Sequence, residues 1–209
     1  MVMLTRYGFG AIYIDGKEYK ISPTFQNIDK LGTPKEIINK VIDFYSANKF
    51  IDLFMLSIEI IDCCTNKPLP IEYTGEIVAT KSGLKYKPSK LLGMATAEDL
   101  ITLASHCLKY GVIGVTDNKS ESEGEPIKEF DAYYYIGLAC EHLRRSREEA
   151  ADMTLTEFLM AWDIKFPEAK KKRDERLTKA EQQRLMDYQD ELDRKAEEKR
   201  KSKNNTLQS

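Results

Sequence analysis

The sequence has few of the side chains on which enzyme active sites depend. It holds 2 histidines, 4 cysteines and 1 tryptophan in 209 residues. A catalytic serine or cysteine needs a base within hydrogen-bonding reach, and only His106 and His142 carry an imidazole. No GxSxG turn surrounds a serine, and GVIGV at residues 111–115 lacks the GK[ST] ending of a phosphate-binding loop. We therefore expect no catalytic residue, no cofactor and no enzymatic activity.

The cysteines do not follow the spacing of a disulfide framework or a zinc site. Adjacent Cys63 and Cys64 cannot form an ordinary bridge with each other. Cys107 and Cys140 each lie near a histidine, but residues one or two apart on a helix point in different directions, whereas metal ligands must converge. We expect free thiols in a reducing compartment and no bound metal.

Long apolar runs are also missing. No stretch of 18 or more apolar residues exists, and MVMLTRYGFG at the N-terminus lacks the apolar core and cleavage site of a secretory signal. We therefore expect a cytoplasmic protein with no membrane partner.

Charge is abundant and concentrated at one end. Residues 170–203 contain 13 Lys or Arg and 9 Asp or Glu, a net charge of +4, so the remainder carries −6 to reach the total of −2. Domains commonly hold about 100–200 residues, which favours one body and an extension. We predict a mostly helical body at 1–168, with a candidate hinge loop at 116–126, and a charged tail at 169–209 that is helical or disordered.

An antiparallel hairpin is predicted at residues 11–21, AIYIDGKEYKI. Asp15 and Gly16 suit the two turn positions with positive backbone angles. In this register Ile12 lies opposite Tyr19, and one face of the hairpin is apolar. We therefore expect a mainly α protein of the α+β class, with a helical bundle-like core and a small N-terminal hairpin.

Helices are predicted by start signals followed by apolar residues three and four apart. Residues 49–64 are apolar almost all round, which favours a central helix over a buried strand, and residues 65–95 favour a loop with a short strand at GEIVA. Gly111 is expected to end a helix. The start signals are Ser22-Pro23 and caps at Thr33, Thr96, Ser146 and Thr154. The core-facing residues expected in the helices that begin near Ser22, Thr33 and Thr96 are Phe25, Ile28, Leu31, Ile37, Ile38, Val41, Ile42, Tyr45, Leu100, Ile101, Leu103, Ala104, Cys107 and Leu108.

The segment 141–166 has the rhythm of a helix-turn-helix. A recognition helix presents Arg, Lys, Asn or Gln to base edges. This one presents Thr154, Thr156, Glu157, Asp163 and Lys165, which is a poor surface for a duplex. The tail interleaves acids with its bases, so nucleic acid is a disfavoured partner.

The order of the motifs resembles a known group of proteins. ISPTFQNIDKLGTPKEII, LLGMATAEDLITLASHCLKYGVIG and YYYIGLACEHLRRSREEAADMTLTEFLMAWDIKFPE follow the hairpin, and in this order they resemble tail assembly chaperone-type proteins of tailed bacteriophages. The similarity spans roughly residues 8–168. It implies a non-enzymatic helper in the host bacterial cytoplasm that binds the tape-measure protein, and with it other tail proteins, during tail morphogenesis.

Partner contacts are expected at two places. One is an apolar groove near the last two helices, and the other is the thin apolar stripe of the tail, which would fold on binding. For the tryptophan, plain core packing is the equal alternative. Self-association into a homo-oligomer stays open, as do two other functions, a DNA-associated regulator and a structural tail or virion subunit. The candidate partner-binding residues are Phe158, Leu159, Trp162, Leu177, Tyr188 and Leu192.

Overall fold

The computed structural model describes residues 2–4, 7–81, 83–88, 96–115 and 128–168. The chain divides into two units, of which the first comprises Met1–Lys119 and Glu123–Lys165. The second comprises Ser120–Ser122 and Phe166–Ser209 and is described only at 166–168. The predicted hinge loop at 116–126 and the tail at 169–209 therefore lie outside the described residues.

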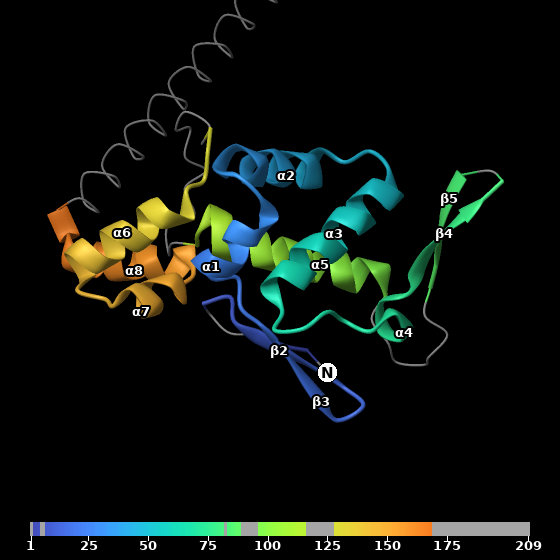
Figure 1. Cartoon of the computed structure of the whole chain (residues 1–209), viewed down its shortest axis with the longest axis horizontal. Coiled ribbons are helices and arrows are strands. Elements are labelled where there is room, and N and C mark those ends of the chain that lie inside the picture. Colours follow the sequence, from blue (N-terminus) through green and yellow to red (C-terminus); the bar gives the residue numbers. More distant parts are fainter. Residues whose placement is uncertain (1, 5–6, 82, 89–95, 116–127, 169–209) are drawn as a thin grey trace, which may run out of the picture. The chain divides into compact units, whose positions relative to one another are not determined.

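The first unit is mainly helical with two small antiparallel sheets, so the predicted α+β class is confirmed for this part of the chain (Figure 1). The strands are β1 (Val2–Leu4), β2 (Gly10–Ile14), β3 (Lys17–Ile21), β4 (Glu76–Thr80) and β5 (Gly83–Lys87). The helices are α1 (Phe25–Ile28), α2 (Pro34–Ser46), α3 (Phe50–Cys64), α4 (Ile71–Thr74), α5 (Ala97–Leu108), α6 (Ala132–Leu143), α7 (Arg147–Ala151) and α8 (Leu155–Lys165). None of these helices has both the length and the apolar character that crossing a bilayer requires.

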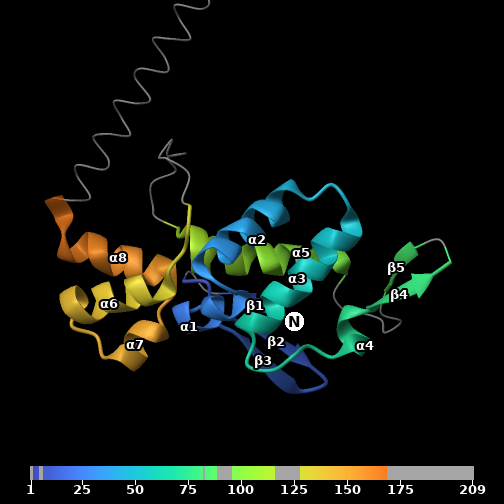
Figure 2. The ribbon, with the colours of Figure 1, turned by 45° about the horizontal axis from the view of Figure 1, so that its top comes forward.

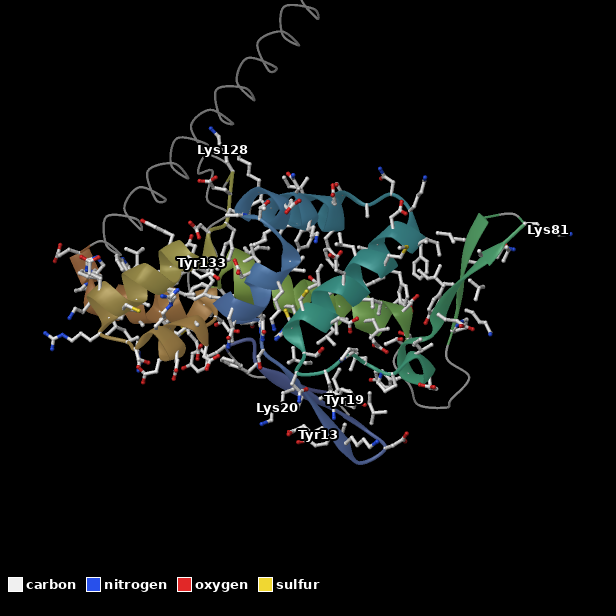
Figure 3. All side chains as sticks on the ribbon, in the orientation of Figure 1. Tyr13, Tyr19, Lys20, Lys81, Lys128 and Tyr133 are labelled. Atoms are coloured by element: carbon white, nitrogen blue, oxygen red, sulfur yellow. The ribbon has the colours of Figure 1, made fainter. Side chains whose placement is uncertain are left out.

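The N-terminal hairpin has the predicted register. Ile12 pairs with Tyr19, and both turn residues have positive φ, 48° at Asp15 and 73° at Gly16. Tyr19 is buried whereas Tyr13 is 42% exposed, and the two rings are labelled in Figure 3. The sequence missed β1, which pairs with β2 and completes a three-stranded sheet, order β1-β2-β3.

Helix α3 lies in the core as predicted, and it packs along α5. Ile60, Ile61 and Cys64 are fully buried in α3, which decides against the strand alternative. The predicted strand at GEIVA is present as β4, and it pairs with β5, which the sequence did not predict.

The predicted inner face of α2 is partly wrong. Ile37 and Ile38 are buried, but Ile42 is 56% exposed and Tyr45 is 55% exposed. Phe44 is buried instead, so the side of α2 that its neighbours cover is not the side that the apolar periodicity predicts.

Two helix ends also differ from the prediction. The chain after α5 continues through a π-helical turn, Lys109–Ile113, and stops at Gly114, where φ is 78°, so Gly111 does not end the helix. The first short helix is preceded by Thr24, rather than by Ser22. The capping boxes predicted at Thr33, Thr96, Ser146 and Thr154 are confirmed.

Helices α6, α7 and α8 lie together beside α1, as both Figure 1 and Figure 2 show. An aromatic cluster joins them. Phe25 of α1 stacks on Tyr135 of α6 at 5.5 Å between ring centroids, and it meets Phe158 of α8 edge-on at 6.1 Å. Phe130, just before α6, lies 6.3 Å from Phe25. The start and the end of the first unit therefore share one core.

Candidate functional site

The sequence TLTE at the start of α8 positions the site. Thr154 caps the helix: its Oγ1 accepts a hydrogen bond from the Glu157 N–H at 3.1 Å, and the Glu157 carboxylate accepts one from the Thr154 N–H at 3.1 Å. The same Thr154 hydroxyl donates to the carbonyl oxygen of Tyr7 at 3.0 Å. The beginning of α8 is thereby tied to the segment that precedes β2.

Thr156 ties the same helix to the chain after α5. Its hydroxyl donates to the Tyr110 carbonyl at 3.2 Å and accepts from the Val115 N–H at 2.9 Å. Thr154 and Thr156 are both buried. These threonines therefore hold α8 against the core. A helix-turn-helix would need them exposed so that they could contact base edges.

The segment Tyr7–Phe9 is held in place from a second side. The carbonyl of Gly8 lies 3.1 Å from Nε2 of His106 on α5. Gly8 has φ of 94°, and a Cβ there would lie 2.4 Å from Cβ of Tyr110, so only glycine fits this close approach. The backbone of this segment is therefore held against α8 and α5.

A pocket of about 580 Å³ lies between this segment, α7 and the outer face of α8. We call it the α8 pocket. Its apolar lining is formed by Tyr7, Phe9, Met153, Met160, Ala161 and Ile164. Its charged lining is formed by Arg145, Glu149, Asp152 and Glu157.

The apolar lining includes groups that the fold itself does not cover. Ile164 is 82% exposed and Tyr7 is 40% exposed, whereas Met153 is buried at the base. Methionine side chains are flexible and polarizable, so Met153 and Met160 can adapt to differently shaped apolar partners. The pocket thus offers an apolar surface to a partner.

The charged lining is acidic on balance, with three carboxylates and one guanidinium. Burial raises the pKa of the Glu157 carboxyl, whereas the hydrogen bond from the Ser146 N–H lowers the pKa of exposed Glu149. Asp152 accepts a hydrogen bond from the side-chain amide of Gln26. Glu157 is therefore the carboxylate for which a cationic partner would relieve the largest cost of burial.

The predicted partner-binding residues of α8 lie on another side of the helix. Phe158 is only 3% exposed and belongs to the aromatic cluster, so its proposed contact with a partner is wrong. Trp162 is half-buried, with its ring 5.3 Å from Phe158 and 5.4 Å from His142. Leu159 is partly buried and packs close to Gly114. Leu177, Tyr188 and Leu192 lie outside the described residues, so their role stays a prediction.

The sequence analysis missed the residues that line the α8 pocket. One signal was present: α8 is apolar on more than one side, since Met160, Ala161 and Ile164 are added to the core residues Leu155 and Phe158. A helix at the edge of the core whose apolar residues extend beyond its core-facing stripe has apolar surface left for a partner. No pattern in the sequence indicated that Tyr7 and Phe9 would also line the pocket.

The described residues contain no disulfide and no cluster of metal ligands. The four cysteines are free thiols there, and no group of three or more His, Cys, Asp or Glu converges as metal ligands would. Cys64 on α3 and Cys107 on α5 are both buried. Their mutual hydrogen bond, together with burial, raises the pKa of the Cys64 thiol, which makes this thiol a poor nucleophile.

A family model matches residues 46–184, which is more than half of the chain. The model describes a family of unknown function, DUF6246. The chain belongs to this family. No curated protein and no solved structure matches the chain.

The DUF6246 match covers one part of the site and leaves out the other. It includes α7, α8 and all four charged residues of the α8 pocket, and it continues beyond α8 to residue 184. Tyr7, Phe9, α1 and all of α2 except Ser46 precede its first residue. The family match therefore crosses the boundary that the sequence analysis placed at residue 168.

The imidazole that holds Gly8 gives the fold a pH dependence. Burial lowers the pKa of His106 from its ordinary value of 6.5, so the folded protein binds this proton less tightly than the unfolded chain. The contribution is fully present above about pH 6.5 and is lost as the pH falls from there through the lower folded-state pKa. We expect urea midpoints of the wild type to fall between pH 7 and pH 5.5 relative to those of His106→Gln.

Comparing the wild type with His106→Gln cancels the contribution of the other titrating groups to the pH dependence of stability. Desolvation raises the pKa values of the Glu157 and Asp62 carboxyls, which act in the opposite direction, but both groups are present in both proteins. Parallel pH profiles for the wild type and His106→Gln would show that His106 does not carry this effect.

Proposed function

We propose that this protein is a non-enzymatic tail assembly chaperone that binds the tape-measure protein of a tailed bacteriophage in the host cytoplasm. The observation that carries the proposal is the open apolar pocket on the outer face of α8. It is supported by the resemblance of the motif order, whose sharpest block, MTLTEFLMAWDIKFPE, includes α8 itself.

A pocket of this kind suits a helical client. A long protein with amphipathic helices exposes apolar stripes before it assembles, and such stripes aggregate. A partner shelters them when anchors three and four residues apart enter an apolar groove. Met160 and Ile164, four residues apart on α8, provide one side of such a groove, and Tyr7 provides aromatic surface on the other.

The surface charge does not favour a DNA-associated regulator. The α8 pocket is acidic on balance, and two of the α8 residues considered for base contacts, Thr154 and Thr156, are buried. A phosphate backbone would be repelled by the carboxylates. A structural virion subunit would remain in the finished particle, whereas a chaperone would not.

Co-expression with the tape-measure protein of the same phage tests the proposal. We expect the wild-type chain to raise the soluble fraction of that protein at least several-fold and to co-purify with it. Ile164→Glu should abolish both effects, because it places a charge in the apolar part of the pocket at a side chain that is 82% exposed and does not support the core.

Ile71→Glu is the matched control, since Ile71 is 64% exposed on α4 and does not line the α8 pocket. It should behave as the wild type, and both variants should melt as the wild type does. Unchanged solubility of the tape-measure protein together with no co-purification would refute the chaperone function. Stoichiometric presence of the chain in purified particles would assign it to the virion structure instead.

A further inference from the structure

We propose that the α8 pocket selects helical segments that carry Lys or Arg beside their apolar anchors, and that the carboxylates of Glu157 and Glu149 bind these cationic side chains. The inference rests on the proposed function in one respect, that the occupant of the pocket is a helix. It adds the chemistry by which that client segment is recognised.

The first observation is the position of the charges around the apolar lining. Glu149 on α7, Asp152 between the helices and Glu157 on α8 line the same cavity as Met160 and Ile164. Arg145 is the single cationic group of this lining. A bound helix with apolar anchors would therefore bring its flanking residues next to three carboxylates that share a single guanidinium.

The second observation is the burial of Glu157. Its pKa is raised chiefly because burial penalises the charged form. Its carboxylate accepts a hydrogen bond from the Thr154 N–H, but two carboxylate oxygens offer about four acceptor sites in all. An ammonium or guanidinium group on the client can use the remaining sites and offset the cost of burying the charge.

The same charges argue against other occupants. An acidic or phosphorylated segment would meet three carboxylates. The body of a second copy is also a poor electrostatic match, because the chain outside residues 170–203 carries a net charge of −6. A basic amphipathic helix satisfies both the apolar and the charged lining.

Capping chemistry allows the charge to be removed without loss of the fold. Glu149 and Glu157 both occupy the N3 position of a capping box, with Ser146 and Thr154 respectively. Glutamine can make the same reciprocal hydrogen bonds at N3. Glu149→Gln/Glu157→Gln therefore deletes two charges from the pocket while both caps remain. Glu36→Gln is the matched control, because Glu36 has the same N3 role on α2 and does not line the pocket.

The test measures binding of two labelled probe peptides to the full-length chain by fluorescence anisotropy. Both are 18-residue helices with the same leucine stripe, and one carries lysines where the other carries glutamates. We expect the lysine peptide to bind about tenfold more tightly at low salt. The preference should fall to less than about threefold in the double variant and at high salt, and should persist in Glu36→Gln.

Several outcomes would overturn the inference. Equal affinity for the two peptides would mean that the apolar lining alone binds, which leaves the chaperone function intact. No binding of either peptide, with client solubility still raised in co-expression, would place the client elsewhere on the protein. A change in self-association of the double variant, measured by sedimentation, would assign the pocket to a second copy.

Discussion

Phe25→Ala should lower the free energy of unfolding by about 3–5 kcal/mol, which is the usual cost of emptying a phenylalanine site in a packed core. For a domain of ordinary stability this is a large share of the total, so the variant should unfold near physiological temperature. Phe25 has no exposed surface, although it belongs to a helix of only four residues.

The cost is large because the ring joins distant parts of the chain. It contacts Phe130, Tyr135 and Phe158 at ring-centroid distances between 5.5 and 6.3 Å. Rings of this kind contribute beyond their buried area when they meet edge-on or stacked. Alanine leaves a cavity among three rings that cannot all move inward, because each is held by its own helix or turn.

Thermal and urea unfolding measure this effect. Tyr133→Ala is the control, since Tyr133 is 60% exposed on α6 (Figure 3) and its removal should change stability by no more than about 0.5 kcal/mol. A loss below about 1.5 kcal/mol for Phe25→Ala would mean that the N-terminal helix and α6–α8 do not share a core.

Gly111→Ala should destabilise the protein by about 1–3 kcal/mol, even though alanine is the better helix former. A Cβ at Gly111 would lie 2.8 Å from the carbonyl oxygen of Pro23 and 2.9 Å from both Cδ1 and Cγ1 of Ile28. A backbone oxygen cannot move aside as a side chain can. The chain around Pro23 and the π-helical turn must separate, which disturbs the contact between α1 and that turn.

Gly137→Ala provides the opposite result. Gly137 lies in the interior of α6, and a Cβ there meets nothing within 4 Å. The substitution should raise stability by about 0.5–1 kcal/mol, because glycine is the poorer helix former. If both glycine variants changed stability in the same direction, the close approach at Gly111 would not be the cause.

The local elements were predictable where a few neighbouring residues decide them. The hairpin followed from Asp15 and Gly16, and four helix starts followed from capping boxes whose partners are three residues apart. Such interactions are formed within one turn of the chain, so the sequence contains both participants.

The faces of the helices were less predictable. Ile42 and Tyr45 fit the apolar periodicity of α2 but are more than half exposed. Periodicity shows which side of a helix is apolar, whereas the neighbouring elements decide how much of that side is covered. The same limit applies to β1, whose pairing with β2 depends on a return of the chain that no local pattern indicates.

For the candidate site, the sequence pointed to α8 and to the side of it that carries Phe158, whereas the α8 pocket lies on another side. The cap at Thr154 and the apolar character of α8 were visible in the sequence. That Phe158 would enter an aromatic cluster with Phe25, and leave Ile164 toward solvent, depends on a partner 133 residues earlier in the chain.

The sequence by itself determined the secondary structure of most of the body, the hairpin register and the scarcity of catalytic side chains, because these depend on residue types and on spacings of a few residues. Only the tertiary structure decided that Tyr7 and Phe9 face α8 and that three carboxylates gather around one apolar pocket. The physical reason is that the hydroxyl of Thr154 binds the carbonyl of Tyr7 across 147 residues of sequence. No pattern of local spacing specifies such a contact, because it forms only when the whole core has packed.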